Sequence, residues 1–318
     1  MSVWNSNVAR QLREPLLRAA FTTAGVVVAT FLILHIIPGD PAQMILGDRA
    51  NNEAVQGLRD SLGLNRPLLE QFRAFVLGIA TRGSVGDSLV YRVPASQLVL
   101  GRLPVTLSLV ALSTFFTIVL VGALSIFSAL NEGRAADHLI RSLSTLGAAM
   151  PVFWVAIILI LLFSVHLRWF PVGGIGRQGF FNSLVLPSFT AAVTTAPILV
   201  RSLRTQLLEV INADFVTMLR VSGVSQARIL FRHVLPNSAV PALILLGINI
   251  GGMLGGSIIL ERVFALPGVG SLLFDAIAKR DFPLIQTIAL FSAFGVVAVS
   301  LLTDVCVRFL DPRARPVE

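Results

Sequence analysis

The chain has 318 residues, of which 55% are hydrophobic and 13% are Asp, Glu, Lys or Arg, about half the charged share of an average soluble domain. Its mean hydropathy of +0.82 excludes an ordinary soluble protein and favours a chain that lies in a lipid bilayer. The only cysteine, Cys306, excludes a disulfide within the chain and a zinc site built on several thiolates.

The charge is strongly basic, with 25 Lys and Arg against 17 Asp and Glu. In a soluble protein this excess would suggest nucleic acid, but here the arginines are scattered between apolar runs, so membrane topology explains them better. Lys279 is the only lysine, and Arg280 follows it where a phosphate-binding P-loop needs Ser or Thr. The chain therefore does not carry a P-loop ATPase of its own.

Six charge-free intervals are long enough for a helix that crosses the hydrocarbon, because about 20 residues are needed and an ionised side chain at mid-bilayer is costly. The expected spans are residues 19–39, 103–131, 142–167, 178–200, 233–260 and 282–303. The fourth is the weakest, since Ser, Thr and Asn interrupt it. The first is interpreted as an uncleaved span, because it exceeds the apolar part of a secretory signal. The intervals predict an all-α integral membrane protein.

Basic residues orient this arrangement. Short loops and termini on one side carry 13 Arg, and short loops on the other carry 5 Arg or Lys. Since basic residues concentrate on the cytoplasmic side, both termini are expected to be cytoplasmic. Residues 40–102 then form a helical extracytoplasmic segment, with helices from Asn52 and from Pro67. Two amphipathic faces favour a docking surface there, and a spacer packed on the helix ends is the alternative.

Residues 201–236 form the one long cytoplasmic loop. Asp214 is expected to begin a short helix, Gly223 to break it, and a second helix to follow up to Pro236, where the chain bends. In the second helix one side is apolar and another is basic. The apolar side comprises Ala227, Leu230, Phe231 and Val234, and the basic side comprises Arg228 and Arg232. Such a loop either docks on a cytoplasmic partner or rests on lipid headgroups.

Candidate pathway residues lie in the third, fourth and fifth spans. The fifth span contains glycines at four-residue spacing, namely Gly247, Gly251, Gly255, Gly252 and Gly256. This spacing allows close helix packing or movement at a gate. Asn249 lines a pathway or hydrogen-bonds a neighbouring helix, and Pro151 and Pro197 are expected to kink their spans. The six intervals contain no Asp or Glu, which argues against a proton-coupled carrier, and no catalytic or metal-binding constellation is present in the sequence.

From Gly223 to Leu235-Pro236, the loop resembles the Glu-Ala-Ala loop of bacterial binding-protein-dependent ABC importer permeases. In that loop a Gly is followed, after nine residues, by Ile-x-Leu-Pro. Here His233 stands at the Ile position and Thr217-Met218-Leu219 at the Glu-Ala-Ala position, which puts in doubt any contact assigned to an acid there. Runs similar to the peptide and nickel permease branch occur in order along nearly the whole chain. They include Pro38-Gly39-Asp40-Pro41, Leu62-Gly63-Leu64, Gly86-Asp87-Ser88, Leu103-Pro104-Val105-Thr106, Phe170-Pro171-Val172-Gly173-Gly174, Leu266-Pro267-Gly268-Val269-Gly270, Arg280-Asp281-Phe282-Pro283 and Asp311-Pro312-Arg313.

This resemblance implies a type I ABC importer permease fold, with six transmembrane helices in one domain. It implies a coupling role for Asp214, Arg220, Gly223, Ala227, Arg228, Arg232, Leu235 and Pro236. It also implies a second homologous permease, two ATP-binding subunits that hold ATP and Mg²⁺, and an extracytoplasmic solute-binding protein. The chain itself would be a non-catalytic subunit of a bacterial inner membrane, without cofactor, metal or nucleic acid of its own.

The branch handles peptides, nickel chelates, glutathione and some sugars, and di- or oligopeptides are favoured here. A secondary carrier or channel that works alone is the alternative, and a membrane scaffold or enzyme is a third class. Copurification with ATPases and a second permease distinguishes the three.

Overall fold

The structure is a computed structural model that describes residues 17–32, 41–46, 51–61, 63–176 and 179–310. These residues form helices, with one isolated β-bridge between Asp87 and Pro94, so the all-α prediction is confirmed. The short helices outside the main bundle are α2 (Pro41–Leu46), α3 (Asn52–Ser61), α4 (Leu68–Arg82), α9 (Asp214–Val221), α10 (Gln226–Arg228), α12 (Ile258–Val263) and α13 (Val269–Ala278). The longer helices are the first helix (Leu17–Leu32), α5 (Ala95–Leu130), α6 (Ala135–Ala149), α8 (Phe180–Ile211), α11 (Leu235–Gly256) and α14 (Phe282–Leu310).

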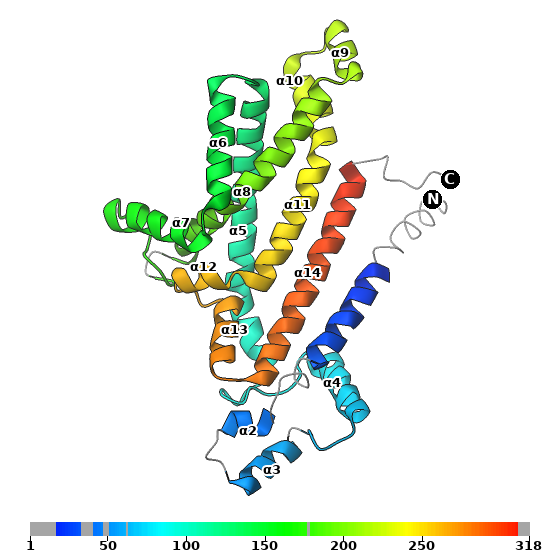
Figure 1. Cartoon of the computed structure of the whole chain (residues 1–318), viewed down its shortest axis with the longest axis vertical. Helices are drawn as coiled ribbons and strands as arrows, with labels where there is room; N and C mark the ends of the chain where they lie inside the picture. The colour runs from blue at the N-terminus through cyan, green and yellow to red at the C-terminus, as the bar shows by residue number, and fades with distance from the viewer. Residues whose placement is uncertain (1–16, 33–40, 47–50, 62, 177–178, 311–318) are drawn as a thin grey trace.

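Helix α8 is the centre of the bundle, where it contacts α5, α6, α7 (Val152–Leu159) and α11 (Figure 1). Of its most apolar stretch, 67% is buried, against 6% for α14. Its hydroxyl groups are satisfied within the helix, as where Thr190 Oγ1 donates to the Leu186 carbonyl at 2.7 Å. The polar residues that weaken the fourth expected span therefore do not prevent it from being the most buried helix.

Four of the described helices are long and apolar enough to cross a membrane, and a fifth span results if the bent pair formed by α6 and the helix after it is one span. The expected first span, 19–39, is described only as far as Leu32. The structure thus supports four or five of the six expected spans.

The third expected span is broken rather than kinked at Pro151. Helix α6 ends at Ala149, and α7 with the π-helical segment η1 (Ile160–His166) leaves it at 109°. Met150 is extended, with φ −84° and ψ 128°, as expected for a residue that precedes proline. The ring of Pro151 and its missing N–H complete the break, so residues 142–167 do not form one continuous helix, and they make a single span only as a bent pair.

The fifth expected span does not bend at Pro236. A continuous helix runs from Gln226 to Gly255, through the π-helical turn η2 (Ile229–Val234) and into α11. A π-turn widens the helix and relieves the contact between a proline ring and the preceding turn, so the predicted bend is wrong. The break comes instead at Ser257, after which α12 begins, three residues before the expected end of the span at Leu260.

Helices α2, α3, α4 and α13 lie at the end of the bundle opposite to α9 (Figure 1). Helix α3 is capped by Asn51, whose Oδ1 accepts from Ala54 N at 2.8 Å, rather than by the expected Asn52. The first helix is held here by Phe31, whose ring meets those of Phe72 and Phe75 of α4 edge-on. These contacts fix the helical segment after the first helix to the bundle.

Candidate functional site

The connection between α8 and α11 is shorter than expected, because α8 continues to Ile211. Helix α9 then begins at Asp214, whose carboxylate suits the positive end of the helix dipole. It ends at Val221, and Gly223 follows with φ +77°. Val224 N bonds the Leu219 carbonyl at 3.1 Å across this turn. A left-handed residue after a helix end is commonly glycine, and nothing lies within 4 Å of a Cβ placed at Gly223, so its conformation and not its size is what the fold requires.

Helix α9 presents an apolar ridge away from the bundle, formed by Phe215, Met218 and Val221, with 42%, 71% and 86% of their surfaces exposed. Residues three apart lie on one side of a helix, so these side chains form a continuous strip, called here the α9 ridge. On the other side Val216 is fully buried in a cluster with Ile229 and Val234. The buried Val216 therefore fixes α9 to the bundle, while the ridge itself stays exposed among the described residues.

The basic residues of the loop are arranged around α9 and the following helix. Arg220, Arg228 and Arg232 are exposed, as are Asp214 and Ala227, whereas Leu235 and Pro236 are half-buried. None of the three arginines forms an ion pair with the described residues. The fold thus brings the eight predicted coupling residues to one end of the bundle, and their coupling role stays a prediction.

The apolar side expected for the second helix is correct at Leu230 and Val234, which pack in the buried cluster, and wrong at Ala227 and Phe231. Ile229 and Val234, five residues apart, are buried, while Ala227 and Phe231 are exposed. The π-helical turn η2 explains this, because its hydrogen bonds span five residues instead of four and bring i and i+5 to the same side. Helical periodicity in the sequence gives no sign of that extra residue.

Below this site a buried ion pair joins α5, α6 and α8. Arg204 Nε and Nη2 each lie 2.7 Å from a carboxylate oxygen of Asp137. Asp137 also accepts from Ser128 Oγ at 2.5 Å and from Gly133 N at 3.1 Å. In the sequence Arg204 is one of the 13 arginines that indicate the membrane orientation, and that count alone does not predict this pair. A lone Asp in a short basic loop is the available signal.

The predicted pathway residues do not gather at one place. A Cβ at Gly247 would overlap Thr303 of α14, and one at Gly251 would lie 3.6 Å from Val296, so both glycines pack α11 on α14. Gly252 and Gly255 meet nothing within 4 Å. Asn249 is half-buried and has no side-chain hydrogen bond to the described residues. Helix α8 continues without a break through Pro197, where a kink is expected. The Pro197 ring lies 3.1 Å from the position of a Cβ at Gly147 of α6.

Three comparisons place this arrangement among known proteins. Residues 121–316 match the family described as binding-protein-dependent transport system inner membrane component, and residues 12–110 match its N-terminal family. The chain belongs to this family. A putative peptide transport system permease of Brucella abortus is 37% identical over 295 residues, which cover 91% of this chain and 94% of that protein. The oligopeptide permease AppB of Bacillus subtilis is 33% identical, with 91% and 94% covered, and the glutathione permease GsiC of Escherichia coli is 33% identical, with 91% and 93% covered.

Among solved structures, a chain of the MetNI methionine ABC transporter, in inward-facing conformations, aligns with a TM-score of 0.55 at 16% identity. The alignment covers 68% of this permease and 97% of that chain. It supports the type I permease fold. The permease is therefore a multi-pass inner-membrane subunit of an ABC transport system, and the resemblance drawn from its motifs is confirmed.

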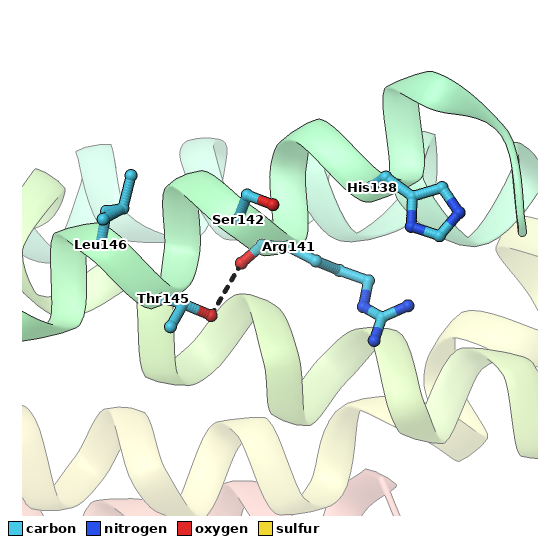
Figure 2. A pocket seen from close by; sticks show the side chains of 5 residues that line it. All are labelled: His138, Arg141, Ser142, Thr145 and Leu146. Carbon is cyan, nitrogen blue, oxygen red and sulfur yellow. Dashed lines mark hydrogen bonds between the residues drawn. The ribbon is translucent and has the colours of Figure 1, made fainter.

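The permease has a shallow depression on the outer face of α6, of about 470 Å³, lined by His138, Arg141, Ser142, Thr145 and Leu146. Figure 2 shows these side chains along one helix, with Thr145 Oγ1 donating to the Arg141 carbonyl at 3.0 Å. All five are exposed, so the depression is a surface feature and contains none of the predicted pathway residues. Within the described residues no group of three or more His, Cys, Asp or Glu is placed to hold a metal ion.

Two further carboxyl groups, those of Asp281 and Glu261, are fully buried. The sequence patterns do not predict their burial. Asp281 holds the loop before α5, because Ser88 Oγ donates to it and Leu89 N lies 3.2 Å from its Oδ1. Glu261 lies just beyond the expected end of the fifth span. A charge-free interval ends before the first charged residue, so the interval 233–260 stops just before Glu261. The interval therefore gives no sign that this acid is buried.

Proposed function

We propose that this permease takes up di- or oligopeptides as one of two homologous membrane subunits of an ABC importer. An extracytoplasmic solute-binding protein delivers the peptide, and two separate ATPase subunits with ATP and Mg²⁺ drive its passage. The peptide class is supported by the names of the relatives from Brucella abortus and Bacillus subtilis, a peptide permease and an oligopeptide permease. The glutathione permease GsiC, itself named for a peptide-like substrate, is consistent with this class.

The observation that carries the coupling role is the α9 ridge. It is an exposed apolar strip of Phe215, Met218 and Val221, fixed from behind by the buried Val216. An apolar ridge with arginines beside it suits a groove on an ATPase subunit. Through Val216, α9 packs on Ile229 and Val234 of the continuous helix that runs through η2 into α11, so the ridge is attached to a helix long enough to cross the membrane.

The orientation is part of the proposal. The start of the first helix and the end of α14 both point to the end of the bundle that carries α9 (Figure 1), which agrees with cytoplasmic termini and with the excess of Arg on that side. Six spans follow if the bent pair of α6 and α7 counts as one span and the first helix counts as another. Residues 40–102 then face the solute-binding protein.

Copurification tests the assembly. From native membranes in mild detergent, the tagged permease should bring down two ATPases and a second permease, and reconstituted vesicles should take up labelled dipeptide only with ATP and the binding protein. Uptake by the purified permease alone would instead establish a carrier or channel. ATP-driven assembly without peptide binding by the cognate binding protein would keep the importer but reject the peptide class.

A further inference from the structure

Glu261 lies at the point where α11 gives way to the hairpin of α12 and α13. Its side chain is fully buried and accepts three hydrogen bonds from three different segments. Thr106 Oγ1 of α5 donates to Oε1 at 2.8 Å, Ser257 Oγ donates to the same oxygen at 2.7 Å, and Ser271 N of α13 donates to Oε2 at 2.7 Å. No basic side chain among the described residues pairs with it.

Helix α13 depends on this carboxyl group for its N-terminal cap. The residue before α13 is Gly268, which has no side chain to cap the helix. Ser271 N is one of the first-turn donors that an N-cap side chain would normally satisfy, and Glu261 satisfies it from another helix. A side chain at Gly268 would overlap the Glu261 carboxyl group, and one at Gly270 would lie 2.9 Å from the Ile258 backbone.

Thr106 extends the network to α5. Its hydroxyl donates to Glu261 and accepts from Val269 N at 2.9 Å. Glu261 also binds Ser257, so α5, the start of α13 and the Ser257 turn are joined through Thr106 and Glu261. The loop after η1 is bound to the same place, since Gly174 N donates to the Phe264 carbonyl at 2.8 Å. The junction thus fastens three helices and a loop at this end of the bundle.

The helix that contains α11, called here the α11 rod, reaches the α9 site at the end opposite to the Glu261 junction. The helix from Gln226 to Gly255 is continuous, and its first buried residue, Ile229, packs in the cluster that holds Val216 of α9. Just before Ser257, Cβ atoms placed at Gly252 and Gly255 would meet nothing within 4 Å among the described residues. One end of the rod is therefore attached to the ridge and the other to the Glu261 junction.

We propose that Glu261 is a positioning residue of the transport cycle, which anchors the Ser257 end of α11 to α5 and α13 so that movement received at α9 tilts α11 about this point. The inference rests on the proposed coupling function of α9. Without the anchor, the same movement shifts α11 along its axis and leaves the α12–α13 hairpin loose. ATP hydrolysis then continues while uptake falls.

The test uses the assembled transporter with Cys306→Ser as background, because Cys306 is exposed. Ala276→Cys is the probe, since Ala276 is 1% exposed on α13, and Ala129→Cys, 7% exposed at the α9 end, is the reference probe. The variants are Glu261→Gln and Thr106→Val. Thr190→Val is the matched control, because Thr190 is an equally buried threonine whose hydroxyl bonds only its own helix.

Both variants should raise maleimide labelling of the Ala276→Cys probe by roughly tenfold, in line with loss of a hydrogen bond to a charged group, without changing labelling of the Ala129→Cys reference. They should also lower peptide uptake per ATP hydrolysed, whereas Thr190→Val changes neither quantity. Unchanged labelling of the α13 probe, or raised labelling with an unchanged uptake-to-ATP ratio, overturns the proposal. If the parent transporter shows no ATP-driven uptake, the proposed function fails instead, and the labelling still decides whether Glu261 positions the hairpin.

Discussion

Arg204 and Asp137 form a buried, two-pronged ion pair, in which two guanidinium nitrogens of Arg204 lie 2.7 Å from the two carboxylate oxygens of Asp137. Arg204 is 14% exposed and Asp137 is 1% exposed. The pair joins α8 to α6 and, through Ser128, to α5. It lies directly below the α9 site, so it fixes the three helices on which that site is built.

Arg204→Met or Asp137→Asn should therefore destabilise the permease, by about 3 to 5 kcal/mol, because each leaves one charge or its partner groups buried without compensation. The double variant should recover part of this loss, since no unpaired charge remains. Thermal unfolding of the purified protein, followed by intrinsic fluorescence, measures the effect. The control is Arg201→Met, one turn away on α8 and exposed. Equal melting temperatures for Arg204→Met and Arg201→Met would show that the pair contributes nothing.

The sequence predicts the long helices well because lipid imposes a simple rule on them. The part of α14 from Phe282 to Thr303 carries no charged residue, and Phe282 begins both the expected span and the helix. The start of α9 at Asp214 and the break at Gly223 are also readable, since a first-turn acid and a left-handed glycine act locally. Where a residue's preference is set by its neighbours in the chain, the prediction holds.

The features that sequence reasoning misses depend on distant partners. Glu261 is buried because Thr106, 155 positions away, donates to it, and no local pattern signals that contact. The burial of Ile229 together with Val234 follows from a π-turn, which the usual helical period cannot anticipate. Proline predicts a kink at Pro151 and a bend at Pro236, yet the helix breaks at the first, where Met150 is extended, and continues through the second, where the π-turn η2 precedes the proline.

Gly223→Val should abolish uptake while leaving the chain in the membrane. Gly223 has φ +77°, and a β-branched residue is strained in that region by about 1 to 3 kcal/mol, so the turn after α9 reorganises and the α9 ridge changes its direction. The measurement is ATP-driven uptake, normalised to the amount of assembled protein.

The matched control is Gly83→Val, because Gly83 ends α4 with φ +60° and nothing lies within 4 Å of a Cβ placed there. It carries the same backbone strain but does not adjoin the α9 ridge. Gly223→Asn should retain part of the uptake, since asparagine tolerates this conformation. Similar losses in Gly83→Val and Gly223→Val would assign the effect to strain alone and remove the support for a coupling role.

Met218→Glu should release the ATPase subunits without unfolding the permease. Met218 is 71% exposed at the middle of the α9 ridge, so the charge is harmless in the free chain but costly inside an apolar contact. Binding of the ATPases, measured by copurification, should fall roughly tenfold or more, as for a central residue of an interface. Asn212→Glu, exposed two residues before α9, is the control. Undiminished copurification of the Met218 variant would place the ATPase contact elsewhere.

Gly247→Leu and Gly252→Leu should separate packing within the chain from contacts outside it. A side chain at Gly247 overlaps Thr303 of α14, whereas nothing lies within 4 Å of a Cβ at Gly252. Leucine at Gly247 should force α11 and α14 apart and lower the free energy of unfolding by about 1 to 3 kcal/mol, the usual cost of overpacking.

Leucine at Gly252 should leave the melting temperature of the isolated permease unchanged, and any loss of uptake in that variant would then arise from the second permease or from the pathway. The melting temperature of the isolated permease reports packing within the chain, and uptake by the assembled transporter reports function. Equal destabilisation by the two variants would mean that Gly252 packs within the chain, and its open position on α11 would then carry no functional meaning.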